Sequence, residues 1–338
     1  MSPKTRQLLL NFVGYPAFAI FMFVVFAYWT FPYDRVRDYI VQEVEYPVGP
    51  GGDRRDSGLR LEIDELSPSF LTGVDLEGVR FTKLATAAPD GTIEEKPIVI
   101  QIDEVSARIS LLSLLAGTTA VSFDATIGEG SIDGEFALSE EETHIEAELE
   151  DVDLRRLGVL SALIGLPVSG VLGGTIDLTI GKESSATKGS VDIAIANVVV
   201  GDGRAKLKIE GLGAEGMSVG RIEVGKVVVQ ATVENGLAKF TKLGTEGGRD
   251  LTVTGSGKIH LVLPVRMSRL ENVLLNVKFV DAFKTRDDRT RGLFAMIDVV
   301  PRLRAARTPD GALQWEIGGS FGGGSLRANP AGSTRMPR

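Results

Sequence analysis

The chain has 338 residues, 43% of them hydrophobic, a formal net charge of −8 and no cysteine. The missing cysteines exclude disulfides, thiolate zinc sites, iron–sulfur clusters and cysteine nucleophiles. The acidic balance, without a long basic run, argues against nucleic acid as a partner. Forty glycines and only 7% aromatic residues indicate many turns and an interior built mainly from aliphatic side chains.

An uncharged apolar stretch covers residues 8–31, and Lys4 and Arg6 precede it. As a helix it can cross a hydrocarbon core about 30 Å thick, and bases before a span favour a cytoplasmic N-terminus. A cleaved signal peptide is the alternative, but its apolar region is shorter and ends in small residues, whereas this stretch ends in bulky aromatic residues. We therefore predict a cytoplasmic segment at 1–7, an uncleaved transmembrane helix at 8–31, and a periplasmic remainder attached to a bacterial inner membrane.

Residues 32–47 have an amphipathic pattern, because Val36, Ile40 and Val44 recur every fourth position among charged residues. Acids balance bases in this segment, which favours a juxtamembrane helix packed on the start of the next domain over one lying on lipid. Residues 48–58 combine glycine, proline and charge without an apolar period. They are predicted to be a linker.

From residue 59 the apolar period changes from 3.6 to 2. Short alternating runs predict strands with one wet face, joined by turns such as Glu234-Asn235-Gly236. The runs include 59–63, 145–149, 176–180, 191–195, 207–209, 222–224, 227–229 and 259–263. One-sided alternation with short connections indicates antiparallel pairing. We expect residues 59–320 to form one periplasmic, repetitive antiparallel β-sheet domain, either a groove or a curved sandwich.

Helical spacing interrupts the strand series at residues 111–116 and 154–164, and residues 267–275 are a third candidate helix. Each is expected to cap an end of the sheet. The last residues, 321–338, are rich in glycine, serine and proline and are predicted to be a disordered tail. The predicted fold class is therefore mainly β, with one N-terminal transmembrane helix and two or three short helices.

Two motifs look like catalytic signatures. Residues 211–216 match G-x-G-x-x-G, but the helix whose N-terminus would bind a pyrophosphate does not follow. Ser218 lies in a G-x-S-x-G motif, and Asp250 and His260 follow in the order of an α/β-hydrolase triad. A nucleophile elbow needs a helix after the serine, whereas Ser218 precedes another predicted strand, and His260 lies on the polar face of its strand. A serine hydrolase is therefore the least favoured hypothesis.

Carboxylates are the remaining candidate metal ligands, since the two histidines lie far apart in the chain. The acidic runs at 140–142 and 148–153 lack the ligand spacing of a calcium loop. A solvated acidic strand edge explains them, and such edges discourage aggregation between sheets. The sequence predicts no catalytic, cofactor-binding or metal-binding residues and no enzyme activity.

The order of several segments resembles the GspN family of the type II secretion system. The segments follow the basic N-terminus and the apolar stretch, and they are 66–79 (LSPSFLTGVDLEGV), 107–117 (ARISLLSLLAG), 128–134 (GEGSIDG), 166–170 (LPVSG) and 310–319 (DGALQWEIGG). The same pieces are similar to the periplasmic parts of AsmA-like proteins, which also have one span followed by repetitive β-structure. The resemblance covers nearly the whole chain.

The GspN resemblance implies a non-enzymatic accessory component of type II secretion, anchored in the inner membrane, with other secretion subunits as partners. The AsmA likeness implies a β groove whose apolar inner face shields phospholipid acyl chains. The two roles share the fold and the anchor and differ in the partner. We favour the secretion component, with lipid transfer as an alternative that could coexist with it, because alternation shows which residues share a face and not what covers that face.

Overall fold

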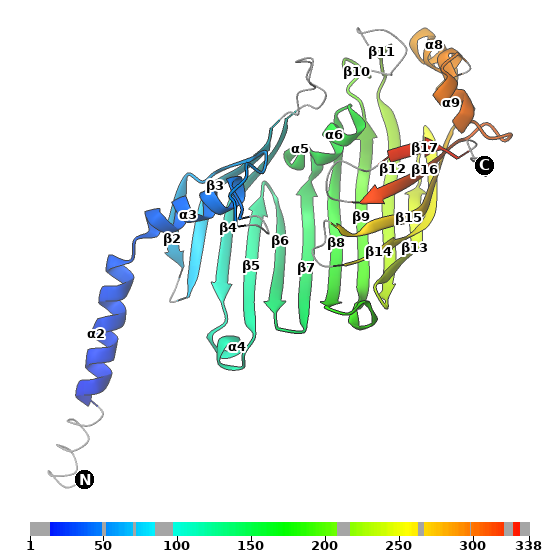
Figure 1. The fold of residues 1–338 in the computed structure, drawn as a ribbon. Helices are drawn as coiled ribbons and strands as arrows, with labels where there is room; N and C mark the ends of the chain where they lie inside the picture. The colour runs from blue at the N-terminus through cyan, green and yellow to red at the C-terminus, as the bar shows by residue number, and fades with distance from the viewer. Residues whose placement is uncertain are drawn as a thin grey trace.

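The computed structural model describes residues 14–48, 52–69, 72–84, 97–207, 217–262, 267–297, 299–320 and 327–331. In these residues the protein is mainly β, and 15 strands form one antiparallel sheet (Figure 1). The strands are β1 (Leu59–Glu62), β2 (Glu65–Ser69), β3 (Gly73–Lys83), β4 (Ile98–Ile109), β5 (Thr119–Ile127), β6 (Gly130–Leu138), β7 (Glu142–Asp153), β8 (Val168–Gly181), β9 (Lys188–Val200), β12 (Ile222–Glu234), β13 (Leu237–Glu246), β14 (Leu251–His260), β15 (Arg269–Phe279), β16 (Leu313–Ser320) and β17 (Arg327–Pro330).

The sheet is a meander in which most strands pair with their neighbours in the chain. Its order is β1-β3-β4-β5-β6-β7-β8-β9-β12-β13-β14-β15-β16-β17, and β2 also pairs with β3. The strands β10 (Lys206–Leu207) and β11 (Met217–Ser218) form a separate two-stranded sheet. The described residues thus contain one large antiparallel sheet and one small sheet, which confirms the predicted mainly β fold.

In the described residues, eight α-helices lie before the strands and between them. They are α2 (Tyr15–Thr30), α3 (Tyr33–Glu45), α4 (Leu111–Leu115), α5 (Leu154–Leu157), α6 (Val159–Ile164), α7 (Asp281–Lys284), α8 (Asp288–Ile297) and α9 (Pro301–Ala306). The predicted helix at 111–116 is confirmed. The one predicted at 154–164 is confirmed as two pieces, because Gly158 has a left-handed backbone with φ 62° and separates α5 from α6. Helices α7, α8 and α9 were not predicted.

Most strand predictions hold, with changes at the irregular positions. Of the run predicted at 207–209, Leu207 lies in β10 and residues 208–209 lie outside the described residues. The predicted turn at Asn235 and Gly236 is confirmed, since both residues have positive φ, 52° and 75°, between β12 and β13. The runs 222–224 and 227–229 belong to one strand, β12, whose register shifts around Gly225. The strand expected at 259–263 ends at His260, and residues 263–266 lie outside the described residues.

The prediction of a helix at 267–275 is wrong, because this segment enters strand β15, which pairs with β14 and β16. Asn272 has φ 48° and lies where both pairings shift register. Such a bulge places Leu270 and Val273, three positions apart, on the same face of the strand, and this spacing imitates a helix. Part of the predicted tail is also ordered, since residues 327–330 form β17 against β16.

No single helix in the part of the chain that the structure describes combines the length and apolarity of a membrane span. Helices α2 and α3 have the length and apolarity of a membrane span only when they are taken together, as a pair bent by 58°. Residues 1–13, which include the first part of the predicted span, lie outside the described residues.

Helix α3 packs on the start of the sheet, as the amphipathic pattern at 32–47 predicts. Its Ile40, Val41 and Val44 contact a buried cluster formed by Leu61, Ile63 and Val79. We call this group of side chains the α3 cluster. It joins the N-terminal helices to β1 and β3.

The sheet curves toward the side on which α5 lies. The four-residue helix α5 contacts both β4 and β8, which are separated in the sheet by β5, β6 and β7. In a flat sheet those two strands would lie about 19 Å apart, at roughly 4.8 Å per strand, so only a bent sheet lets one short helix contact both. Figure 1 shows the curved sheet, with α5 and α6 at its upper edge.

Candidate functional site

One face of the sheet gathers the aliphatic side chains of the strands. The cross-strand register aligns Ile145 with Leu178, Ile176 with Val191, and Ile193 with Val229. Because side chains alternate along each strand, these residues and their neighbours two positions away share a face. We call it the apolar face. Leu154 and Leu157 of α5 contact Leu172 and Ile195 in one cluster, so this is the face toward which the sheet bends.

The apolar face is continuous even where the alternation of apolar and polar residues along a strand shifts by one position. In β4, Ile102 and Val105 are three positions apart, yet both contact the α3 cluster. Of their partners in β3, Val79 belongs to the α3 cluster and Leu76 packs against it, and Gly78 between them has φ 62°. The phase change therefore occurs in both strands at the same level, and the apolar side chains stay on one face.

The middle of the apolar face is not covered by the described helices. Its residues are Ile132, Phe136, Leu138, Ile145, Leu149, Ile176, Leu178, Val191, Ile193 and Val229, which we call the open middle. Most are half-buried, and Phe136 and Leu138 are 38% and 48% exposed. The helix–strand packing of the described residues lies elsewhere, with α3 on β1 and β2, α4 on β5, α5 on β4 and β8, α6 on β4, and α9 on β16 and β17.

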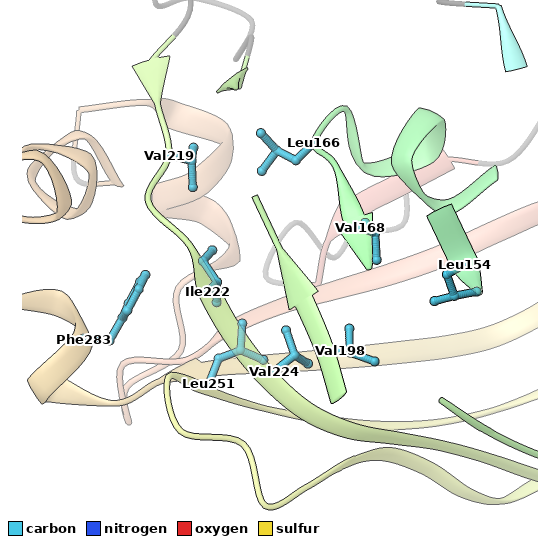
Figure 2. Packing of buried hydrophobic residues seen from close by; sticks show 9 residues of the cluster. All are labelled: Leu154, Leu166, Val168, Val198, Val219, Ile222, Val224, Leu251 and Phe283. Atoms are coloured by element: carbon cyan, nitrogen blue, oxygen red, sulfur yellow. The ribbon is translucent and has the colours of Figure 1, made fainter. Parts of the chain in front are cut away.

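One end of the apolar face is closed by a second cluster, which we call the covered end (Figure 2). It consists of Leu154, Leu166, Val168, Val198, Val219, Ile222, Val224, Leu251 and Phe283, which are 2–7% exposed. Phe283 of α7 stacks on Phe279 at 5.7 Å between ring centroids, and Phe294 of α8 meets both rings edge-on. Long connections between strands supply these helical side chains.

The segment α5–α6 bridges the curved sheet at the covered end, and we call it the strap. Arg156 donates to both carboxylate oxygens of Asp103 in β4 at 3.0 Å, although the two residues are 53 positions apart. Asp103 also accepts a hydrogen bond from the Gly128 amide at 2.6 Å. A Cβ at Gly158 would lie 2.9 Å from the Val99 carbonyl oxygen, so the close approach of the strap to β4 requires glycine there.

A cavity of about 480 Å³ lies between the strap and the first residues of β4, β8 and β10. Apolar side chains such as Ile98 and Val168 line it, with Arg155 and Lys206 at the polar part of its wall. Arg155 is held by Asp153, to which it donates at 2.6 Å, and this hydrogen bond lowers the pKa of the Asp153 carboxyl. The cavity is thus an apolar space with basic groups at its margin.

The opposite face of the sheet carries many acidic side chains. Asp124 lies directly opposite Asp133, and Glu146 lies between Glu135 and Asp177 on the two neighbouring strands. The hydrogen bond to Asp133, followed by burial, raises the pKa of Asp124. Among the described residues, no three His, Asp or Glu side chains gather in a way that could hold a metal ion.

The three residues of the hydrolase-like pattern are not brought together. Ser218 belongs to the small sheet, where it pairs with Lys206. Asp250 is 2% exposed. Its carboxylate accepts a hydrogen bond from the Glu223 amide at 2.7 Å and forms an ion pair with Arg286. His260 contacts Glu271 at 2.7 Å. Asp250 and His260 flank opposite ends of β14, about 30 Å apart at the usual rise of a strand. The G-x-G-x-x-G motif at 211–216 lies outside the described residues.

Two features of this site were missed from the sequence. The Arg156–Asp103 salt bridge joins segments that are far apart in the sequence. A charged residue in each segment does not indicate which residue it pairs with. The open middle was predicted as a shared face, but its lack of a cover is a property of the connections between strands. No family model matches the chain, and no curated protein and no solved structure matches it.

Proposed function

We propose that this chain is a membrane-anchored envelope protein that binds phospholipid acyl chains along its open middle and acts as an accessory component of the type II secretion system. The observation that carries the binding activity is a continuous aliphatic face that none of the described helices covers between its two covered ends. The secretion role rests on the ordered segments that resemble the GspN family.

Energetics support an apolar ligand on the open middle. Full burial of a Val, Leu or Ile side chain contributes about 1.5–3 kcal/mol, and the ten side chains of the open middle are only partly buried. Exposed contiguous apolar patches larger than a few hundred Å² are more often binding sites than ordinary protein surface. Flexible acyl chains fit such a face, because it offers almost no polar group that needs a specific partner.

The anchor is supported by the side chains of α2. Bulky residues around this helix are exposed, including Phe18 at 61%, Phe23 at 73% and Trp29 at 81%. Water would penalise such a helix, whereas a bilayer would cover it, and the aromatic residues at its end suit the membrane interface. In this proposal residues 8–31 span the inner membrane, with Lys4 and Arg6 in the cytoplasm and the sheet in the periplasm.

Native mass spectrometry of the full chain, released from detergent micelles, tests the binding activity. Wild type is expected to carry phospholipid, and the variant Ile176→Asp/Ile193→Asp is expected to lose most of it. Asp177→Asn/Asp192→Asn changes the adjacent positions on the polar face and serves as the matched control. Wild type without bound phospholipid, or equal occupancy in all three proteins, would contradict the proposal.

The secretion role needs a separate experiment. Deletion of the gene in its host is expected to reduce export of type II cargo, and an affinity-tagged chain is expected to capture other secretion subunits. Normal secretion with no subunit captured would reject this role and leave lipid binding as the activity to be explained. A reporter fused after residue 58 checks the anchor, since alkaline phosphatase is active only if that position is periplasmic.

A further inference from the structure

Among the described residues, the tip of the β4–β5 hairpin has several strongly exposed apolar side chains. In α4, Leu111, Leu112 and Leu114 are 56%, 81% and 46% exposed. Ile109, the last residue of β4, is 41% exposed. Residues 109–123 contain no charged side chain. Surface leucines occur singly on many proteins, but four large aliphatic side chains within six residues form a surface that water disfavours.

The backbone of this tip satisfies its own hydrogen bonds. Ser110 caps the helix by accepting from the Ser113 amide at 3.3 Å, and the Ser113 hydroxyl donates to the Ser110 oxygen at 2.9 Å. The amides of Ala116 and Thr118 donate to carbonyls within the same turn at distances of 2.9–3.2 Å. A closed, capped and uncharged turn can enter the apolar boundary of a bilayer without leaving these backbone groups unpaired.

Three other connections at the same edge of the sheet are polar, whereas the β14–β15 connection has exposed Val262 and Met267. The β6–β7 turn contains Glu140 and Glu141, the β8–β9 connection contains Lys182 and Glu183, and the β12–β13 turn is Asn235-Gly236. Apolar side chains are therefore not required in every connection at this edge, and the edge position alone does not explain the leucines of α4. In Figure 1, α4 lies at the lower edge of the sheet, on the side of the molecule toward which α2 descends from α3.

We propose that α4 is a second membrane contact, which inserts its leucines into the surface of the bilayer that α2 spans. This inference rests on the proposed anchor and deepens the proposed lipid binding. Ile109 pairs with Val121 in β5, and Val121 pairs with Phe136 of the open middle. The leucine tip therefore continues into the apolar face. Acyl chains can pass from the bilayer to the open middle along this path without crossing a charged side chain.

A single fluorescent label tests the contact, because the chain has no native cysteine. Leu112→Cys carries an environment-sensitive dye in the full-length chain, reconstituted in vesicles of phosphatidylethanolamine and phosphatidylglycerol. Leu112 is 81% exposed, so the substitution disturbs little packing. Glu141→Cys, in the exposed β6–β7 turn of the same edge, is the matched control. We expect blue-shifted emission and quenching by headgroup-level nitroxide lipids at Leu112, and neither effect at Glu141.

Two results would overturn the inference. Emission typical of water at both positions would mean that α4 does not reach the bilayer. A blue shift at Leu112 that nitroxide lipids do not quench would mean that protein, such as a second copy of the chain, covers the tip. Both results are independent of lipid binding by the open middle, since native mass spectrometry of the wild type measures that activity separately.

Discussion

The covered end and the open middle are both built from aliphatic side chains of alternating strands, yet the described helices cover only the covered end. Val198 and Ile193 belong to the same strand, β9, in which a bulge at Asn197 (φ 53°) shifts the alternation, but Val198 is 5% exposed while Ile193 is half-buried. The connections between strands make the difference. At the covered end, α5–α6 follows β7 and α7–α9 follows β15, whereas the described connections at the opposite edge are tight turns or carry short elements, such as the five-residue α4 between β4 and β5. An alternating strand thus specifies a face, and the loops decide whether that face becomes core or binding surface.

The largest expected effect is in the covered end. Phe283→Ala removes a ring that is 2% exposed and that contacts Phe279 and Phe294. Loss of a buried phenylalanine costs about 3–5 kcal/mol of unfolding free energy. Urea unfolding of the full chain in detergent, followed by circular dichroism, measures this change. A cost below about 1 kcal/mol would mean that α7 does not pack on the sheet as described.

A smaller effect on stability is expected in the open middle. Ile193→Asp places a charge on a half-buried, uncovered position, where water can still reach the carboxylate, so we expect a cost of about 1–2 kcal/mol. The neighbouring Asp192→Asn is expected to be nearly silent. The same unfolding measurement compares the two variants with Phe283→Ala. If Ile193→Asp lowers the unfolding free energy as much as Phe283→Ala does, the open middle is covered.

The strap provides a third comparison, between two adjacent arginines. Arg156→Ala removes the bridge to Asp103, whereas Arg155→Ala removes a pair with Asp153 two residues away. Both pairs are largely exposed, so each is expected to contribute at most about 1 kcal/mol. Hydrogen exchange distinguishes them, because only loss of the long-range bridge should speed exchange at the amides of α6. Equal exchange in both variants would contradict the role of the bridge in holding the strap.

The smallest effect is expected on the polar face and depends on pH. The raised pKa of Asp124 means that the folded chain binds this proton more tightly than the unfolded chain. Its contribution is therefore favourable at low pH and is lost as the pH rises through the folded pKa. Asp124→Asn should stabilise the protein by about 0.5 kcal/mol at pH 7, the scale of a like-charge cross-strand pair, and give no gain below pH 3.8. Equal gains at pH 7 and pH 3 would refute this assignment.

Local patterns were sufficient to predict most of the sheet. Alternation in β7, β8 and β9 and the Asn235-Gly236 turn depend on neighbouring residues, so they can be found in the sequence. The segment 267–275 was mistaken for a helix, because the bulge at Asn272 changes the spacing of its apolar residues. Helices α7–α9 and the Arg156–Asp103 bridge depend on contacts between distant segments. The candidate site was predicted as a face, and its openness required the structure.

Photo-crosslinking at two adjacent residues of β8 tests most directly whether the apolar face holds lipid. Ile176 lies in the open middle, and Asp177 is exposed on the polar face. Each position is replaced by a photoreactive phenylalanine in the full chain, which is irradiated in living cells and then analysed by mass spectrometry. The account predicts a phospholipid adduct at position 176 and none at 177. No lipid adduct at 176, or equal adducts at both positions, would contradict it.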